Sequence, residues 1–210
     1  MLVTVDDKAT YVSTLGQPID PNRPSILFLH GAAMDHTVWT MFARYFVRHG
    51  YNSLAVDLPG HGRSDGPPLD RIEALASFVD ALLGEVGVER ACVVGHSLGS
   101  LVALQLASTS PRVAGLGLVG TGLPMAVADV LLDAAKSDRH EGFDMVTIWG
   151  HSPKAQPGGI AAPGIWMTGA QLRLMERAGS GVLFADLTAC NEFDGGLEAA
   201  SGVTCPVHLI

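Results

Sequence analysis

The apolar positions of the first 120 residues alternate between two kinds of segment. Short continuous apolar runs are typical of strands buried on both faces, and apolar residues at three- and four-residue spacing are typical of amphipathic helices. Because the two kinds follow one another in turn, the pattern predicts an α/β fold, a mostly parallel sheet with helices on both faces. The expected strands cover residues 25–29, 52–56, 91–94 and 113–119, and the expected helices begin near Val38, Ile72 and Leu98.

Two further segments extend this pattern. Residues 10–15 alternate well enough to predict an additional antiparallel strand. Beyond residue 123, helical spacing continues without a buried strand, and a buried-strand pattern returns at 206–210. We therefore expect a core over 1–122, a helical lid inserted over 123–201, and the start of a second core segment over 202–210.

The lid is expected to contain helices at 126–135, 143–149, 170–178 and 182–190, with a stretch rich in Pro, Gly and Ala at 153–163. Its large apolar side chains could line a pocket, although packing onto the core is the commoner role of such residues. These side chains are Met125, Met145, Trp149, Trp166, Met167 and Phe184.

Composition narrows the class of protein. The 210 residues are 48% hydrophobic and 16% charged, which predicts one globular unit. The net charge of -8 argues against nucleic acid and against an anionic membrane surface as partners. We find neither a signal peptide nor an apolar run of about 18 residues, so we expect a cytoplasmic location. The cysteines are expected to be small core residues outside any disulfide framework, and they are Cys92, Cys190 and Cys205.

One stretch carries most of the predicted chemistry: Gly95-His96-Ser97-Leu98-Gly99 fits the pattern Gly-x-Ser-x-Gly. It lies between an expected strand and an expected helix, the context in which this pattern forms a sharp turn that lifts the serine clear. Gly95 and Gly99 are needed because the two backbones pass too close for a Cβ atom. The helix start offers free N–H groups that can stabilise an oxyanion. The stretch predicts Ser97 as a nucleophile for an acyl carbon, with an ordinary turn as the competing interpretation.

Two other patterns point to cofactors and are rejected. Residues 115–120 match Gly-x-Gly-x-x-Gly, but they lie inside an expected strand and not between a strand and a helix, so they do not predict a dinucleotide site. The eight histidines are scattered and do not form a metal-ligand set. We therefore expect no metal and no organic cofactor.

Three motifs, in this order, resemble those of the α/β-hydrolase fold superfamily: His30-Gly31-Ala32-Ala33, residues 57–64, and residues 95–99. The resemblance extends over nearly the whole chain and is closest to lidded members such as carboxylesterases, lactonases and carbon–carbon bond hydrolases. It implies that Ser97 is the nucleophile and that the N–H groups of Ala32 and Leu98 form the oxyanion hole, with Ala33 less suited. The residues that would shape the site around them are His30, Gly31, Gly95, His96 and Gly99.

The resemblance also implies a triad acid after the next-to-last strand and a histidine after the last one. The strand expected at 206–210 resembles that next-to-last strand, and the triad acid and histidine have no counterpart in this sequence. His61 is the least unsuitable substitute for the base, and residues 120–122, another place for the acid, contain none. We therefore expect a C-terminally truncated piece of a hydrolase of about 250–270 residues.

The expected function is hydrolysis of small, mostly apolar esters or lactones by Ser97, with a small-molecule substrate as the partner. One alternative is a catalytically incomplete ligand-binding or regulatory fragment. Its open sheet edge near Leu209 would then be covered by a partner or by self-association. The other alternative keeps the fold and changes the reaction to carbon–carbon bond hydrolysis or perhydrolysis.

Overall fold

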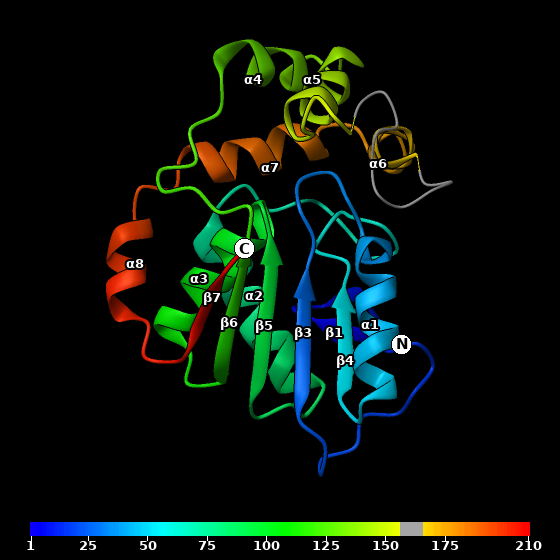
Figure 1. The fold of residues 1–210 in the computed structure, drawn as a ribbon, viewed down its shortest axis with the longest axis vertical. Helices are drawn as coiled ribbons and strands as arrows, with labels where there is room; N and C mark the ends of the chain where they lie inside the picture. The colour runs from blue at the N-terminus through cyan, green and yellow to red at the C-terminus, as the bar shows by residue number, and fades with distance from the viewer. Residues whose placement is uncertain (156–165) are drawn as a thin grey trace.

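The computed structural model describes residues 1–155 and 166–210, and Figure 1 shows their arrangement. The segment expected to be rich in Pro, Gly and Ala, 153–163, lies mostly outside the described residues. The strands are β1 (Leu2–Val5), β2 (Lys8–Ser13), β3 (Ser25–Leu29), β4 (Asn52–Val56), β5 (Ala91–His96), β6 (Val113–Val119) and β7 (Val207–Leu209). The helices are η1 (His36–Trp39), α1 (Thr40–Arg48), α2 (Ile72–Glu85), α3 (Leu98–Thr109), α4 (Asp129–Lys136), α5 (Glu141–Trp149), α6 (Met167–Met175), α7 (Val182–Asn191) and α8 (Gly196–Gly202).

The strands form one sheet in the order β1-β2-β4-β3-β5-β6-β7. The first two strands run antiparallel to their neighbours, and all pairs from β4 to β7 are parallel. The prediction of an α/β fold with a mostly parallel sheet is therefore confirmed. Because parallel strands all end at one edge of the sheet, the loops after β3, β4, β5 and β6 gather there.

The pleat of the central strands divides the apolar core into two layers. Leu27 and Leu29 of β3 pack with α2 and α3 on one face of the sheet. The intervening residues, Ile26 and Phe28, pack with Trp39 and the α1 side on the other face. Both faces of β3 are thus covered, which explains why its last four residues, 26–29, form a continuous apolar run.

The far end of the sheet differs from the prediction. Cys92 was expected in the core but is exposed, and β7 was expected as a buried strand but leaves Leu209 76% exposed. The physical reason is the same for both. Within the described part of the chain, β7 is an edge strand, and no helix packs on the face of β5 and β6 that carries Cys92. Of the other two cysteines, Cys190 is buried and Cys205 is half-buried.

Helices α4 to α7, which we call the lid helices, lie across the carboxyl edge of the sheet (Figure 1). They share an apolar cluster with Ala32 and Ala33 of the loop after β3, and Leu183 and Leu187 of α7 belong to the same cluster. Helix α8 was not expected from the sequence; most of it falls within the segment 123–201 that was expected to form the lid, and it packs against α3 of the core. The lid helices therefore rest directly on one of the loops expected to form the site.

Among the described residues, no helix combines the length and the apolar character that crossing a bilayer requires.

The approach of α3 to the sheet generates a prediction about stability. A Cβ atom on Gly99 would lie 2.5 Å from the carbonyl oxygen of Leu29, so Gly99→Ala forces two backbone segments apart. We expect Gly99→Ala to lower the free energy of unfolding by about 3 kcal/mol, as overpacking against a rigid backbone does. Urea unfolding followed by circular dichroism measures it.

Gly84→Ala is the matched control, because Gly84 is an exposed residue of α2 whose added Cβ would meet only an arginine tip at 3.8 Å. This variant should gain about 0.5–1 kcal/mol from better helix propensity. Equal unfolding midpoints for the two variants would contradict the tight approach of α3.

Candidate active site

Ser97 occupies the bend between β5 and α3. Its φ of 52° and ψ of -119° belong to a region that residues with a side chain rarely adopt, so its backbone is strained. The bend is held from both sides: the N–H of Ser97 donates to the carbonyl of Val119 at 2.9 Å, and its own carbonyl accepts from Ser100. Ser97 is therefore neither in the strand nor in the helix, and its side chain is half-buried.

Two glycines allow this bend to form. A Cβ atom on Gly95 would overlap the carbonyl oxygen of Gly99, and a Cβ atom on Gly99 would meet the carbonyls of Leu29 and His30. The first turn of α3 therefore lies directly against the end of β3 and the start of the loop that follows it. Leu98 begins α3, so its N–H has no acceptor within the helix.

The loop after β3 forms a tight turn over residues 31–34, which we call the Gly31 turn. The N–H of Met34 donates to the carbonyl of Gly31 at 3.2 Å and closes it. Ala33, the third residue of the turn, has a φ of 53°. Its N–H donates to Asp186 of α7 at 2.7 Å, whereas the N–H of Ala32 has no acceptor among the described residues. Of the two alanines, Ala32 is thus the one with an N–H available for an oxyanion.

His30, the residue before this turn, contacts it through its ring. It is fully buried, its Nδ1 lies 2.9 Å from the carbonyl of Gly31, and its Nε2 accepts the N–H of Leu58 at 3.1 Å. These partners require a neutral imidazole with its hydrogen on Nδ1. Burial, and then the neighbouring His61, lower the pKa of His30 to about 4. His30 therefore links the Gly31 turn to the loop after β4 as an uncharged group.

His96, the residue before Ser97, contacts the first residue of the Gly31 turn. Its ring lies beside Gly31, since a Cβ atom there would meet Nδ1 of His96 at 2.9 Å. Burial lowers its pKa. Gly31 is thus needed to let the loop pass over this ring.

The loop after β4 is organised by Asp57, which is fully buried. Its Oδ1 accepts from the backbone N–H of His36 at 2.7 Å and lies 2.8 Å from the Nδ1 of that ring, and its Oδ2 accepts the N–H of Arg63 at 2.9 Å. Burial alone would raise the pKa of Asp57, but the hydrogen bonds from His36 and Arg63 outweigh it and hold the pKa below the usual value. Asp57, His36 and Asp35 are close enough to share a metal ion, yet these bonds already use both oxygens of Asp57.

His61, the candidate substitute for the base, is engaged elsewhere. Its Nδ1 lies 3.0 Å from the carbonyl of Pro59, and its Nε2 lies 2.8 Å from Oδ2 of Asp186. Burial lowers the pKa of His61, but the charge and hydrogen bond of Asp186 outweigh burial, and the pKa is raised overall. Since both ring nitrogens face acceptors, His61 has no lone pair available to take a proton from Ser97. No described histidine hydrogen-bonds to Ser97.

Sequence reasoning missed Asp186, which contacts both His61 and the Gly31 turn. A signal was present: Asp186 is a lone carboxylate on the apolar face of α7, in line with Val182, Leu183 and Cys190, all of which are buried. A charge on the buried face of a helix is rare unless it is paired. The sequence showed that anomaly but could not name the partners, which are 125 and 153 positions away.

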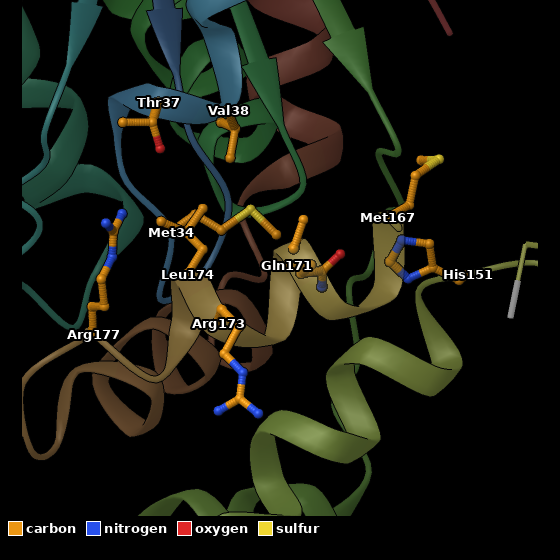
Figure 2. Close-up of a pocket in the computed structure, with 10 residues that line it drawn as sticks. Met34, Thr37, Val38, His151, Met167, Gln171, Arg173, Leu174 and Arg177 are labelled. Atoms are coloured by element: carbon orange, nitrogen blue, oxygen red, sulfur yellow. The ribbon is translucent and has the colours of Figure 1, made fainter. Parts of the chain in front are cut away.

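Two cavities lie between the lid helices and the Gly31 turn. The larger, of about 600 Å³, is bounded by α6, η1 and Met34, and Figure 2 shows the side chains that line it. The smaller, of about 360 Å³, is lined by Ala33, Met34 and His61 among others. Met34 borders both, and Ser97 lines neither. Of the large lid side chains, Met167 lines the larger cavity, while Trp149 and Trp166 are more than half exposed.

Comparison with known proteins gives a consistent picture of the family. A family profile described as alpha/beta hydrolase fold matches residues 24–158. The chain is 39% identical over 122 residues to the dihydrolipoyllysine-residue acetyltransferase component of the acetoin cleaving system of Cupriavidus necator. This match covers 57% of this chain and 30% of that protein. It is 36% identical over 104 residues to the 2-succinyl-6-hydroxy-2,4-cyclohexadiene-1-carboxylate synthase of Salmonella paratyphi C, covering 49% of this chain and 40% of that protein. The matches thus span less than half the length of these two relatives.

Among solved structures, the enol-lactonase from Burkholderia xenovorans LB400 superimposes on the whole chain with a TM-score of 0.82 and 18% identity. The match covers 80% of that structure. At this identity the likeness shows the fold.

The neutral state of His30 generates a prediction about acid stability. The folded protein resists protonating His30 until about pH 4, whereas the unfolded chain takes up that proton near pH 6.5. Stability should therefore fall as the pH drops from about 6.5 toward 4. Between pH 7 and pH 5 the wild type should lose about 2 kcal/mol more than His30→Gln, which keeps an acceptor for Leu58. Urea unfolding at the two pH values measures the difference.

The ring signals of His30 and of the exposed His140 in one NMR titration give a direct check. His140 should titrate above its usual pKa, because the hydrogen bonds that it donates to Glu176 and Asp144 stabilise its cation. A His30 signal that titrates at the ordinary value near 6.5 would contradict the buried, neutral role.

Proposed function

Because this chain belongs to the α/β-hydrolase fold family, we propose that it is the nucleophile-bearing part of a serine hydrolase acting on small, mostly apolar esters or lactones. The observation that carries the proposal is the strained bend at Ser97, between β5 and α3 and against the start of the loop after β3. Strain of this kind persists where the surrounding structure holds it, and it is common at catalytic residues.

The proposed reaction begins with attack of the Ser97 oxygen on the carbonyl carbon of the substrate, as its proton passes to a general base. The carbonyl oxygen becomes an oxyanion, which the N–H groups of Ala32 and Leu98 stabilise. The ester C–O bond then breaks, and the leaving oxygen takes up the proton from the base. Attack of water on the acyl-enzyme, helped by the same base, releases the acid and restores Ser97.

We propose that the base and the acid that orients it come from residues outside this chain. The support is the state of two histidines beside the Gly31 turn: His30 and His61 have both ring nitrogens occupied by other partners. The remaining fifth of the enol-lactonase structure, which has no counterpart among these residues, is consistent with this proposal.

The proposed preference for apolar substrates is supported by the larger cavity. Its walls include Met34, Val38, Met167 and Leu174, which offer mostly carbon and sulfur surface. Its two arginines are already paired, Arg173 with Glu176 and Arg177 with Asp35. A small acyl or alcohol group would bury its apolar surface there next to the Gly31 turn.

The test uses the natural gene product that carries these residues. A fluorophosphonate probe should label it at Ser97, because the probe reacts with an activated serine. Ser97→Ala should abolish labelling and lower kcat for p-nitrophenyl butyrate at least about ten-thousandfold. Mass spectrometry of the labelled peptide and steady-state kinetics measure the two effects.

Ser77→Ala is the matched control, since Ser77 is an exposed serine of α2 whose hydroxyl, among the described residues, bonds only to the carbonyl of Glu73. It should leave both labelling and kcat unchanged. A folded wild-type protein that the probe does not label at Ser97 would refute the proposal and favour a non-catalytic ligand-binding role.

A further inference from the structure

Asp186 is a buried carboxylate that the proposed reaction does not use. It lies in the middle of α7 with 1% of its surface exposed, within the apolar environment of Leu183 and Leu187. Removing a carboxylate from water costs several kcal/mol unless partners compensate for the lost hydration. Its position therefore calls for a reason beyond the packing of a lid helix.

One oxygen of Asp186 joins three segments of the chain. Oδ2 accepts the N–H of Ala33 at 2.7 Å and lies 2.8 Å from Nε2 of His61. Ala33 belongs to the Gly31 turn, His61 to the loop after β4, and Asp186 to a lid helix. The other oxygen, Oδ1, is buried without a partner among the described residues. The contacts of this carboxylate are thus concentrated on the side that faces the Gly31 turn.

The conformation of the Gly31 turn explains what these contacts do. A four-residue turn with positive φ at its third residue is of type II, and that position normally requires glycine. Here it is Ala33, for which a positive φ costs about 1–2 kcal/mol. The alternative, a type I turn, would rotate the peptide between Ala32 and Ala33 and bring a carbonyl oxygen toward Asp186 in place of the N–H. The carboxylate therefore stabilises the observed turn and disfavours the alternative.

We propose that Asp186 is a positioning residue for the reaction: from the lid it fixes the peptide between Ala32 and Ala33, and so restrains the turn whose preceding peptide carries the N–H of Ala32. His61 allows this carboxylate to stay charged in a buried position, because the cation of His61 offsets the charge of Asp186. The other groups that face His61 are His30, at 4.8 Å between ring centroids, and Asp57. This inference rests on the proposed function, since it assigns a role in forming the same oxyanion hole.

The first test is Asp186→Leu, which removes the acceptor and fits the apolar surroundings. An oxyanion donor acts on the transition state, so kcat for p-nitrophenyl butyrate should fall at least about tenfold while KM changes less than about twofold. Affinity for a boronic acid, which forms a tetrahedral adduct with serine, should fall by the same factor as kcat. Active-site titration corrects for any loss of folded enzyme.

Asp138→Asn is the matched control. Asp138 is also a lid carboxylate that holds α7, through the N–H of Gly181 at 2.9 Å and the hydroxyl of Ser180, but it does not contact the Gly31 turn. It should leave kcat and boronate affinity unchanged. Equal losses in the two variants would mean that α7 matters only for the general stability of the lid, which would overturn the proposal.

A second variant separates positioning from structural support. Glycine at position 33 removes the strain of the positive φ, so the turn no longer needs the carboxylate. Asp186→Leu combined with Ala33→Gly should therefore regain most of the kcat that Asp186→Leu loses. No recovery in a folded double variant would contradict the proposed role of the turn.

If the Asp186 variants do not fold, the wild-type protein still provides a test. At pH 7 both ring nitrogens of His61 should carry protons in ¹⁵N NMR spectra, and the amide proton of Ala33 should be shifted downfield and exchange slowly. A neutral His61 with a rapidly exchanging Ala33 amide would overturn the proposal. Fluorophosphonate labelling keeps the two ideas apart: an unlabelled wild-type Ser97 refutes the hydrolase, whereas a labelled enzyme with normal kcat in Asp186→Leu refutes only the role of Asp186.

Discussion

The arrangement of the site depends on the close contact between the first turn of α3 and the ends of β3 and β5. The backbones can approach because Gly95 and Gly99 have no Cβ atom. That contact leaves Ser97 at a backbone angle that a regular strand or helix does not allow. It also fixes the origin of the loop after β3 relative to the start of α3. Ser97 and the nearby N–H groups are therefore positioned by one packing constraint of the core.

Beyond this contact, the loops are organised by buried charges. Asp57 accepts hydrogen bonds from the backbone N–H groups of His36 and Arg63. Asp186 accepts one from the backbone N–H of Ala33 and contacts the ring of His61. In both cases, one carboxylate satisfies donors from segments far apart in the sequence. Loops have few apolar contacts of their own, so charge-assisted hydrogen bonds are the means available to hold them in one conformation.

The sequence predicted the parts of the fold that depend on burial along a single segment. The strands at 25–29 and 52–56 have the bounds that were expected. The apolar runs 26–29 and 54–56 within them indicate burial on both faces. The prediction for Cys92 was wrong because the exposure of one face depends on which helices cover it, and that is a property of the whole topology. The role of Asp186 could not be predicted for a similar reason: its charge is visible in the sequence, but its partners are brought to it only by the fold.

Two of the described ion pairs join the lid side of the chain to the core, one from the turn between α6 and α7 and one from α7, and their surroundings differ. Arg177 of the lid side reaches Asp35 at 2.8 Å, but its side chain is 63% exposed, and an ion pair in that setting contributes little to stability. Asp186 and His61 are each 1% exposed, so breaking their pair would leave a buried charge without a partner. The buried pair is therefore the stronger constraint on the lid. It acts on the Gly31 turn and on the smaller cavity, which Ala33 and His61 help to line, and not on the larger cavity beside α6. A change of lid sequence could reshape the cavity beside α6 without disturbing the turn, provided that an acceptor stays at position 186.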